Sequence, residues 1–531
     1  MFKRKRFEEG VTLCTLSGTN ETGGRNSNFI EYKDNILVID AGFAFPGDEM
    51  YGIDYLIPNF SYLKKRKKNI KGILITHGHL DHTGALPYVL EDLGFPPIYA
   101  GGFPLAWIKE RLTEFGLEKK VKLIEINDKS VLTFGQMRVS YLTNAHSIPD
   151  SYSIFINTPE GNIFFSGDYK IEDEKTDMEA LHDIAGHVDI ALVDSTNVYK
   201  KGKAKPETLA HENLLKVISN HKGRVIVGAF ASLVDRLLTL IDIAQKTNRK
   251  IYISGRSMLM ILEIAKNEGL VKVSPDIFLH EKQLNSVEDS KIIMLITGSQ
   301  GERYAAMNRI ALGEHKYIKA KKGDLVILSA SEVPGNESQI ERMTDGLIKQ
   351  GVDIIKGSEI DVHSGGHGLQ DDMKILYDII RPRYIMPIHG SLTYRYHSQK
   401  IHSSWGHNKD DVLLTEDGQT WILKNREIKR GIKVESKPIL IDGLGVGDIG
   451  DIVLKDRQQL AEFGMFTVIL NLSTKEKRLL GRIRFVSRGF IYMKNSQNLL
   501  KEIDTICRDT HRKWLSEGGK NKLNDELLIE D

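Results

Sequence analysis

The sequence predicts an α/β protein with more than one domain, and three observations support this fold class. Short apolar runs alternate with turns through residues 11–100, and apolar runs alternate with helical stretches after residue 200. The chain has 531 residues, too many for one compact core. Several apolar runs are followed directly by polar side chains, as at the strand ends where α/β proteins place their chemistry.

The first part of the chain contains two predicted strands and one predicted helix. The run N-I-L-V-I-D-A-G at 35–42 predicts a buried strand that ends in a glycine turn, and K-G-I-L-I-T at 71–76 predicts a second. Residues 84–94 predict a short helix that ends at a glycine. The stretch I-T-H-G-H-L-D-H-T-G at 75–84 is therefore expected to form a loop between a strand and a helix.

The second half predicts another α/β domain and then a small terminal one. Strands are expected at 224–230, 250–255 and 291–298, and the stretch 234–246 is an example of the helices between them. Near residue 430 the pattern changes again. Strands are expected at 464–472 and 482–493, followed by a helix from about 498 to 516.

Composition and charge exclude some classes of protein. Hydrophobic residues make up 41% and charged residues 27%, with a net charge of +2, which neither requires nor excludes nucleic acid. The basic clusters are most simply solvated surface. They are Lys3–Arg6, Lys64–Lys68, and Lys200, Lys201, Lys203 and Lys205.

The cysteine count and the lengths of the apolar runs limit the possible disulfides, metal sites and membrane segments. Cys14 and Cys507 lie at opposite ends of the chain, so we expect no disulfide framework and no thiolate metal site. Any metal must be held by histidine and aspartate. No apolar run is long enough to span a membrane and the N-terminus does not resemble a signal peptide, so we expect a cytoplasmic protein with no membrane contact.

The densest group of metal-binding side chains is His77, His79, Asp81 and His82. Their spacing does not fit the i, i+4 face of a helical zinc motif, and an irregular loop can direct the two pairs at two metals. Further candidates follow apolar runs at His146, Asp168 and His389. Each alone is more typical of a structural residue, but together they complete two metal sites. Two neighbouring metals suit phosphodiester hydrolysis.

Several motifs resemble a known family. The motif T-H-G-H-L-D-H at 76–82 is similar to the signature of the metallo-β-lactamase fold. The β-CASP nucleases share the motifs V-D-S-T-N at 193–197, G-R-S-M at 255–258, H-S-G-G-H at 363–367 and P-I-H-G at 387–390. The ribonuclease J family shares T-G-S-Q-G-E at 297–302, V-P-G-N-E at 333–337 and D-G-L-G-V-G-D-I-G at 442–450. The resemblance runs from about residue 11 to about residue 510.

This resemblance implies an αββα metallo-β-lactamase sandwich with an inserted β-CASP α/β domain and a small C-terminal α/β domain. The domain boundaries that we expect are a first sandwich part at 1–205, the β-CASP domain at 206–350, a second sandwich part at 351–430, a linker at 431–450 and an oligomerisation domain at 451–531.

The resemblance also implies a ligand set. One metal, zinc or manganese, would be held by His77, His79 and His146, the other by Asp81, His82 and His389, with Asp168 between them. Asp81 therefore counts among the catalytic residues as well. The family further implies a structural calcium at Asp442 with backbone oxygens near Tyr51 and Ile53.

Two residues are expected to assist catalysis. The family's pattern implies that His367 stabilises charge or protonates the leaving oxygen, a role that suits an imidazole near neutral pH. Asp194 is expected to orient a ligand histidine. The alternative is that Asp194 caps a helix or a turn in D-S-T-N.

A pocket for the RNA 5′ phosphate is also implied. Its expected substrate-binding residues are Phe230, Ala231, Ser232, Arg256, His363, Ser364, Gly365, Gly366 and His367. The alternative for Arg256 is a surface ion pair. Where the family usually has serine and alanine, this chain has Gly365 and Gly368, which puts the 5′-phosphate selectivity in question. The neighbouring Ser364 offers another hydroxyl.

The predicted function is a two-metal ribonuclease. It would act as a 5′-to-3′ exonuclease that favours 5′-monophosphate ends and also as an endonuclease, in mRNA decay and rRNA maturation. Alternatives are a non-catalytic RNA-binding or scaffold subunit, a nuclease that acts on DNA, and a small-molecule hydrolase acting on a lactam or thioester. The roughly 220 residues between Asp168 and His389 argue against the last, which needs no such lid.

The expected partners are single-stranded RNA and an RNA-degradation complex, in a homodimer or homotetramer. The apolar stripe at 499–507 favours oligomerisation, and its alternative is packing within its own domain.

Overall fold

The structure is a computed structural model that describes residues 10–21, 23–47, 49–333, 335–357, 359–443, 445–447, 449–473, 476 and 478–516. The basic run at 3–6 and the end of the expected C-terminal domain lie outside the described residues. The chain forms two compact units, which we call unit 1 (Met1–Phe45 and Leu56–Ile439) and unit 2 (Pro46–Tyr55 and Leu440–Asp531). No helix of the described residues is long and apolar enough to cross a membrane.

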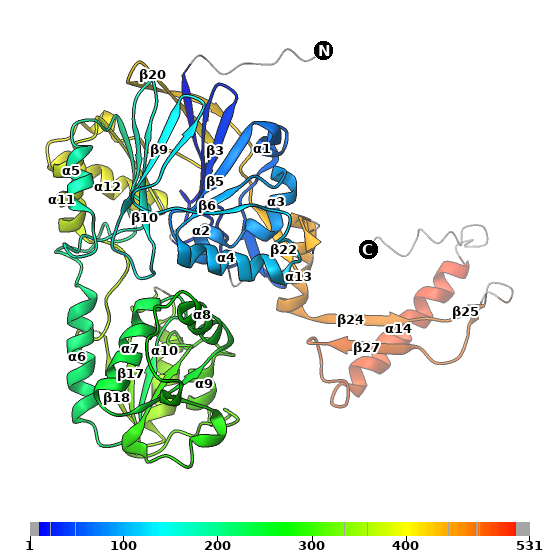
Figure 1. Cartoon of the computed structure of the whole chain (residues 1–531). Coiled ribbons are helices and arrows are strands. Elements are labelled where there is room, and N and C mark those ends of the chain that lie inside the picture. Colours follow the sequence, from blue (N-terminus) through cyan, green and yellow to red (C-terminus); the bar gives the residue numbers. More distant parts are fainter. Residues whose placement is uncertain are drawn as a thin grey trace, which may run out of the picture. The chain divides into compact units, whose positions relative to one another are not determined.

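Unit 1 contains two sheets that face each other (Figure 1). The first sheet, in spatial order, consists of β21 (Glu427–Lys433), β20 (Gln419–Lys424), β1 (Val11–Ser17), β2 (Ser27–Tyr32), β3 (Asn35–Ile39), β5 (Ile70–Leu74), β6 (Ile98–Ala100) and β7 (Leu123–Glu125). The second consists of β19 (Tyr384–Ile388), β12 (Ile190–Asp194), β11 (Ile163–Phe165), β10 (Tyr152–Asn157), β9 (Met137–Thr143) and β8 (Val131–Phe134).

A buried apolar core joins the two sheets, and helices cover their outer faces. Leu13 and Ile30 of the first sheet pack in one cluster with Ile154 and Leu192 of the second. Helices α5 and α11 lie on the outer face of the second sheet (Figure 1). The helices of this part are α1 (Ser61–Lys64), α2 (Leu80–Thr83), α3 (Leu86–Leu93), α4 (Gly102–Glu114), α5 (Met178–Asp183), α11 (Gln370–Ile380) and α12 (Leu392–Ser404). The predicted αββα sandwich is therefore confirmed.

A second α/β domain is inserted between β12 and β19. Its six strands are all parallel, in the order β15 (Phe278–Leu279), β14 (Lys250–Ser254), β16 (Ile292–Ile296), β13 (Val225–Gly228), β17 (Leu325–Leu328) and β18 (Asp353–Lys356). Its helices are α6 (Glu207–Asn220), α7 (Val234–Lys246), α8 (Arg256–Asn267), α9 (Ala306–Ala311) and α10 (Glu337–Ile348). The predicted α/β insertion is thus present.

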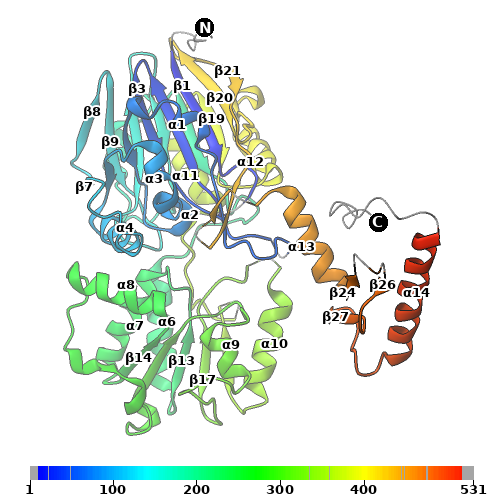
Figure 2. The same ribbon diagram turned by 90° about the vertical axis from the view of Figure 1, so that its right-hand side faces the viewer.

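Both faces of this parallel sheet are buried, which explains why its strands are continuous apolar runs in the sequence. Val225 and Val227 pack under α6, α7 and α8, whereas Ile226 between them packs under α9 and α10. Figure 2 shows α7 and α8 on one side of the sheet and α9 and α10 on the other. Strand β18 lies beyond the predicted boundary at residue 350, and the domain boundaries stay a prediction.

The strands and helices that the sequence predicts are observed, most of them with small shifts at their ends. The strand expected at 482–493 is much shorter and spans only Arg484–Arg488. The predicted helix 234–246 coincides with α7, and the predicted helix near 84–94 is α3, which ends at the left-handed Gly94. One expectation was wrong. Asp81 and His82 do not lie in a loop but in the four-residue helix α2, because the His79 carbonyl accepts hydrogen bonds from the backbone of His82 and Thr83 at 3.1 and 3.0 Å.

Unit 2 contains the strands and the helix that were predicted for the C-terminal region. Its elements are β22 (Ile439–Asp442), β23 (Gly445–Val446), α13 (Asp451–Phe463), β24 (Met465–Ile469), β25 (Leu472–Ser473), β26 (Arg478–Leu479), β27 (Arg484–Arg488) and α14 (Gln497–Ser516), and β4 (Tyr55–Ile57) begins where its first segment ends. β24 pairs with β27 in antiparallel fashion. In the predicted apolar stripe of α14, Leu500 is buried, whereas Leu499 and Ile506 are exposed.

Candidate metal centre

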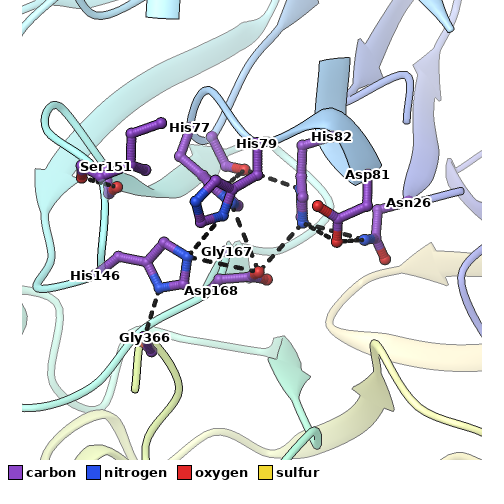
Figure 3. Close-up of polar contacts among 12 residues, drawn as sticks. Asn26, His77, His79, Asp81, His82, His146, Ser151, Gly167, Asp168 and Gly366 are labelled. Atoms are coloured by element: carbon purple, nitrogen blue, oxygen red, sulfur yellow. Dashed lines mark hydrogen bonds and ion pairs between the residues drawn. The ribbon is translucent and has the colours of Figure 1, made fainter. Parts of the chain in front are cut away.

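The predicted ligands meet at one edge of the sandwich, because each follows or lies near the end of a strand. His77 and His79 come after β5, and α2 then adds Asp81 and His82. The second sheet supplies the other three ligands from the segments after β9, β11 and β19, which are His146, Asp168 and His389. Figure 3 shows His77, His79 and His146 on one side of Asp168, with Asp81 and His82 on the other.

The first group consists of His77, His79, His146 and Asp168, whose ligand atoms lie within 4.8 Å of one another. His79 Nδ1 is 3.1 Å from His77 Nε2 and 3.1 Å from His146 Nε2. Burial lowers the pKa of all three imidazoles, so they are neutral near pH 7 and offer lone pairs. Three lone pairs directed at one point repel each other unless a cation lies between them, so this donor set fits a divalent metal.

The second group consists of Asp81, His82, Asp168 and His389. Its close contacts are His389 Nε2 to Asp81 Oδ2 at 3.2 Å and His82 Nε2 to Asp168 Oδ2 at 3.3 Å. Burial alone would lower the pKa of His389, but Asp168 and Asp81 raise it to about 9. The carboxylates therefore make this group a site that favours positive charge, which a divalent cation supplies.

One carboxylate oxygen belongs to both groups. Asp168 Oδ2 lies 3.3 Å from His82 Nε2 in the second group and 3.6 Å from His77 Nε2 in the first. Burial disfavours ionisation of Asp168, but His389 and His82 hold its pKa well below the usual range. Asp168 is thus an anion placed between the two groups and available to both.

The second nitrogen of each candidate ligand histidine also has a partner, which fixes the ring and its tautomer. The partners are Thr76 Oγ1 for His77 (3.1 Å), Asp40 Oδ2 for His82 (2.8 Å), the Gly366 carbonyl for His146 (2.7 Å), Thr196 Oγ1 for His389 (2.6 Å) and the Ser232 carbonyl for His79 (3.4 Å). In the first group, His79 therefore differs from His77 and His146: its Nδ1 faces the other ligand atoms, because its Nε2 faces the Ser232 carbonyl.

Sequence reasoning missed several of these partners. Asp40 accepts hydrogen bonds from the Thr76 backbone N–H at 2.8 Å and from its hydroxyl at 2.9 Å, besides contacting His82. Asn26 approaches Asp81 Oδ2 with its Nδ2 at 3.2 Å. Asp40 had a signal in the sequence, because it directly follows the apolar run of β3. Asn26 had none, since it precedes its strand and no motif surrounds it.

His367 and Asp194 form a pair beside the second group. His367 Nδ1 lies 2.7 Å from Asp194 Oδ2, and His367 Nε2 lies 3.9 Å from Asp168 Oδ2. Burial opposes protonation of His367, but Asp194 raises its pKa above the ordinary value. The other oxygen of Asp194 accepts hydrogen bonds from the Thr196 backbone N–H at 2.8 Å and from its hydroxyl at 2.7 Å.

Both alternatives for Asp194 therefore find a counterpart in the structure. Its Oδ1 caps the turn at Thr196, and its Oδ2 holds a histidine. The nearer histidine is His367, at 2.7 Å, whereas the candidate ligand His389 lies 3.7 Å from Asp194 Oδ1 by its Nδ1 and is also linked to it through the Thr196 hydroxyl.

A cavity of about 460 Å³ opens beside His367, at the carboxyl edge of the parallel sheet. Its lining includes His363, Ser364, Gly365 and His367 of the predicted pocket, together with Asn197, Lys200, Lys203, Ala204, Lys205, Ser299, Gln300, Leu328, Ala330, Ser331, Glu332, Ile340, Lys356, Gly357, Asp361 and Leu369. The basic cluster at 200–205, which the sequence suggested to be plain surface, contributes three of these lysines.

Other predicted pocket residues lie elsewhere. Phe230, Ala231 and Ser232 do not line this cavity; they form the turn between β13 and α7, where the Ser232 carbonyl faces His79. Arg256 is exposed at the start of α8 and also lies outside the cavity lining. Among the residues that the structure describes, no ion pair of Arg256 is found. The role of these four residues in substrate binding stays a prediction.

The glycines of H-S-G-G-H differ in their surroundings. A Cβ at Gly366 would lie 2.4 Å from the His146 ring, so a side chain there would displace a ligand. A Cβ at Gly365 would meet nothing within 4 Å. The neighbouring Ser364 is buried, and its hydroxyl donates to the Lys205 carbonyl at 2.5 Å and accepts from Lys170 Nζ at 2.7 Å. The single hydrogen of the Ser364 hydroxyl is therefore already donated to the Lys205 carbonyl.

The predicted calcium ligands do not form an open cation site. The Arg457 guanidinium, from α13 in unit 2, donates to the Tyr51 carbonyl at 3.0 Å and to Asp442 Oδ2 at 2.7 Å. A Cβ at Gly52 would lie 2.5 Å from the same guanidinium. Ile53 is buried, with its backbone N–H bonded to the Met50 carbonyl at 3.1 Å. A calcium ion would have to displace Arg457, so these residues do not fit it as they stand.

Family models match three parts of the chain. The model described as "Metallo-beta-lactamase superfamily" matches residues 21–209, and the one described as "Ribonuclease J, beta-CASP domain" matches residues 222–347. A third, "Ribonuclease J C-terminal domain", matches residues 452–528. The superfamily implies divalent metal ions, in agreement with the two groups of ligands.

Named relatives cover most of the chain. "Ribonuclease J 1" of Streptococcus pyogenes serotype M3 is 36% identical over 505 residues, 93% of this chain and 89% of the relative. "Ribonuclease J2" of Bacillus subtilis strain 168 is 33% identical over 511 residues, 95% of this chain and 92% of the relative. "Ribonuclease J 2" of Staphylococcus aureus strain MRSA252 is 31% identical over 519 residues, 97% and 93% of the two chains.

The fold is also shared with a solved structure. A crystal structure of a protein of unknown function from Enterococcus faecalis V583 has a TM-score of 0.56 at 14% identity and covers 78% of this chain and 100% of its own. This similarity concerns the fold alone. The relatives and the family models carry the stronger conclusion, which the ligand groups agree with: the chain belongs to the ribonuclease J family.

Proposed function

We propose that this protein is a two-metal ribonuclease that removes nucleotides from the 5′ end of single-stranded RNA, favours 5′-monophosphate ends, and also cleaves internally. The observation that carries the proposal is the convergence of seven histidine and aspartate side chains in two groups that share Asp168. The names of the relatives support RNA as the substrate.

The two groups would hold two divalent ions. His77, His79 and His146 would hold one, Asp81, His82 and His389 would hold the other, and Asp168 belongs to both groups. Imidazole and carboxylate ligands suit zinc and manganese alike. When bound, two such ions supply Lewis acidity toward the phosphate oxygens and lower the pKa of water at the site.

His367 serves as the proton donor or as a stabiliser of charge. Asp194 occupies His367 Nδ1, so His367 Nε2 is the nitrogen that faces Asp168 and the centre. A proton held at Nε2 can pass to the oxygen that leaves when the phosphodiester bond breaks, because Asp194 stabilises the charged imidazole. Asp194 also holds Thr196, and through it His389, so one carboxylate orders both the proton donor and a ligand.

The cavity beside His367 suits the 5′ end of the RNA. Lys200, Lys203, Lys205 and Lys356 line it. Three of them also have a carboxylate partner, whereas no ion pair of Lys200 is found within the described part of the chain. A terminal phosphate held here would place the first phosphodiester near the centre, and that arrangement yields one nucleotide per cycle. The hydroxyl that the family places at Gly365 is missing, so selectivity for the monophosphate rests on the lysines.

We further propose that the protein acts in cytoplasmic mRNA decay and rRNA maturation, as a homodimer or homotetramer that can join an RNA-degradation complex. The exposed Leu499 and Ile506 on α14 support an oligomer contact.

A single RNA oligomer tests the proposal. It carries a 3′ label and either a 5′ monophosphate or a 5′ triphosphate, and it is incubated with manganese and the protein or a His79→Ala, Asp81→Ala double variant. We expect processive shortening of the monophosphate form by the wild type and none by the variant. Internal cuts in both forms, with no end preference, would reduce the proposal to an endonuclease. Intact RNA in every lane would favour the non-catalytic RNA-binding subunit.

A further inference from the structure

A group of aromatic side chains lies on the surface next to the cavity. Tyr199 follows β12 and is 47% exposed. Its ring stacks on His397 with centroids 4.2 Å apart and planes at 21°, and the edge of Tyr394 meets it at 5.1 Å and 90°. The Tyr199 hydroxyl donates to the Thr393 carbonyl at 3.3 Å. The loop after β12 is thereby attached to the first turns of α12, and the tyrosine ring is held in one orientation.

The position of Tyr199 relates this aromatic group to the proposed catalytic site. Asn197 and Lys200, on either side of Tyr199 in the sequence, both line the cavity. Asn197 Nδ2 also donates to the His367 carbonyl at 3.0 Å. The same short loop therefore contacts the proton donor, lines the cavity and presents an exposed aromatic ring.

The two segments that carry these rings are basic. The segments 195–206 and 391–405 contain no aspartate or glutamate. The carboxylates Asp361 and Glu332 of the cavity lining pair with Lys205 and Lys356, and the exposed Asp371 lies next to Gly202. The two segments do contain lysines, of which Lys200 and Lys201 have no ion pair among the described residues. Lys400 lies over the ring of the exposed Tyr396 at 4.6 Å. A flat aromatic ring among unpaired cations is the combination that binds single-stranded nucleic acid, because the rings stack on bases while the cations attract phosphates.

We propose that Tyr199, supported by His397, is a stacking platform for one base of the single-stranded RNA that enters the cavity. The inference rests on the proposed ribonuclease function and adds a binding residue to it. A base stacked on Tyr199 would hold the strand beside His367 and favour cuts in unpaired RNA, since a base within a duplex has no free face.

The test compares the wild type with Tyr199→Ala in steady-state cleavage of a 5′-monophosphorylated RNA. Loss of a stacked base weakens binding by about tenfold or more, so we expect KM to rise by that factor with little change in kcat. Tyr199→Phe keeps the ring and should restore most of the loss. Tyr317→Ala is the matched control: Tyr317 is 43% exposed but precedes β17, at the opposite edge of the parallel sheet from the cavity.

Abasic substrates identify the partner of the ring. RNAs that lack one base, at each of the first positions in turn, are cleaved by the wild type and by Tyr199→Ala. If the platform exists, one abasic position raises the KM of the wild type about tenfold and leaves that of Tyr199→Ala unchanged. Equal KM values for wild type and variant, or a variant defect that no abasic position reproduces, would overturn the inference.

A measurement of RNA binding without cleavage distinguishes the failure of this inference from the failure of the proposed function. Fluorescence anisotropy with a labelled RNA oligomer, in a chelator so that no cleavage occurs, measures the affinity of the full chain. Weaker binding by Tyr199→Ala, in a protein that never cleaves RNA, would leave the platform standing and reject the nuclease. A wild type that cleaves RNA but binds it no better than Tyr199→Ala would reject the platform alone. A wild type that does not bind RNA would reject both.

Discussion

The His367 imidazole and the Asp194 carboxylate form a hydrogen-bonded pair, with 2.7 Å between Nδ1 and Oδ2, beside the seven candidate metal ligands. The second Asp194 oxygen holds Thr196, whose hydroxyl lies 2.6 Å from Nδ1 of the candidate ligand His389. A single carboxylate thus connects the group proposed to move a proton with a group proposed to hold a metal.

This pair predicts a large and non-additive loss of activity. His367→Ala should lower the single-turnover cleavage rate by about 10²- to 10⁴-fold, the usual contribution of a general acid. Asp194→Asn should lower it by about 10- to 100-fold, because the amide no longer fixes the imidazole. Asp194→Asn in the His367→Ala background should cost little more. Thr196→Val is the comparison, since it keeps the contact between His367 and Asp194 Oδ2 and removes the hydroxyl that links Asp194 Oδ1 to His389. Losses that simply multiply would show that the two residues act independently.

The two glycines of H-S-G-G-H should respond in opposite ways. Gly365→Ser meets open space, so it should fold normally and restore a hydroxyl at the cavity. We expect it to increase the preference for 5′-monophosphate over 5′-triphosphate RNA by about tenfold or more, as one hydrogen bond to a charged group would. Gly366→Ala would place a Cβ 2.4 Å from the His146 ring and should lower metal content and activity together. Unchanged end selectivity in Gly365→Ser would place the phosphate outside this cavity.

Arg457 should make the fold of unit 2 independent of calcium. Hydrogen exchange of residues 49–54 should not change when calcium is added to the wild type. Arg457→Met removes the bonds to Tyr51 and Asp442, and exchange in this segment should become faster. Arg478→Met, which breaks an exposed ion pair with Glu476 in the same unit, is the control and should have no effect. Slower exchange of the wild type in calcium would mean that the ion displaces the guanidinium.

A buried histidine predicts part of the pH dependence of stability. His402 in α12 is 4% exposed, its Nδ1 lies 2.8 Å from the Ser398 carbonyl, and burial lowers its pKa to about 4. The unfolded chain binds this proton near the ordinary value of 6.5. The contribution is therefore fully present above that pH and is lost as the pH falls to about 4, amounting to about 3 kcal/mol.

His402→Gln should remove this part of the acid sensitivity. Urea unfolding at about pH 7.5 and about pH 5 gives the free energies of unfolding to compare. The wild type should lose more stability between the two pH values than the variant does. An equal loss in both proteins would show that His402 is already protonated in the fold.

Much of the fold could be predicted because its strands are buried on both faces or end at glycines. The stretch 224–230 contains a continuous run of apolar residues, because Val225 and Ile226 pack against two different layers of helices. That the candidate metal ligands lie close together could be predicted because their segments follow apolar runs, and strand ends meet at one edge of a sheet.

The remaining features depend on contacts that no local pattern contains. The short helix α2 forms because the His79 carbonyl is free to accept two backbone bonds, so Asp81 and His82 are helical. The partnership of Thr196 with His389 joins segments 193 residues apart in sequence. The Arg457 guanidinium meets the Tyr51 carbonyl only because the chain returns to this segment from 406 residues away.

The number of metal ions that activity requires tests the central claim most directly. The protein is stripped of metal, titrated with manganese, and followed both for bound metal per chain and for cleavage of 5′-monophosphorylated RNA. The two ligand groups predict two bound ions per chain, with cleavage appearing as the second ion binds. Asp168→Asn, which disturbs both groups, should bind fewer ions and remain inactive. Full activity with one ion per chain, or with none, would contradict the two-metal account.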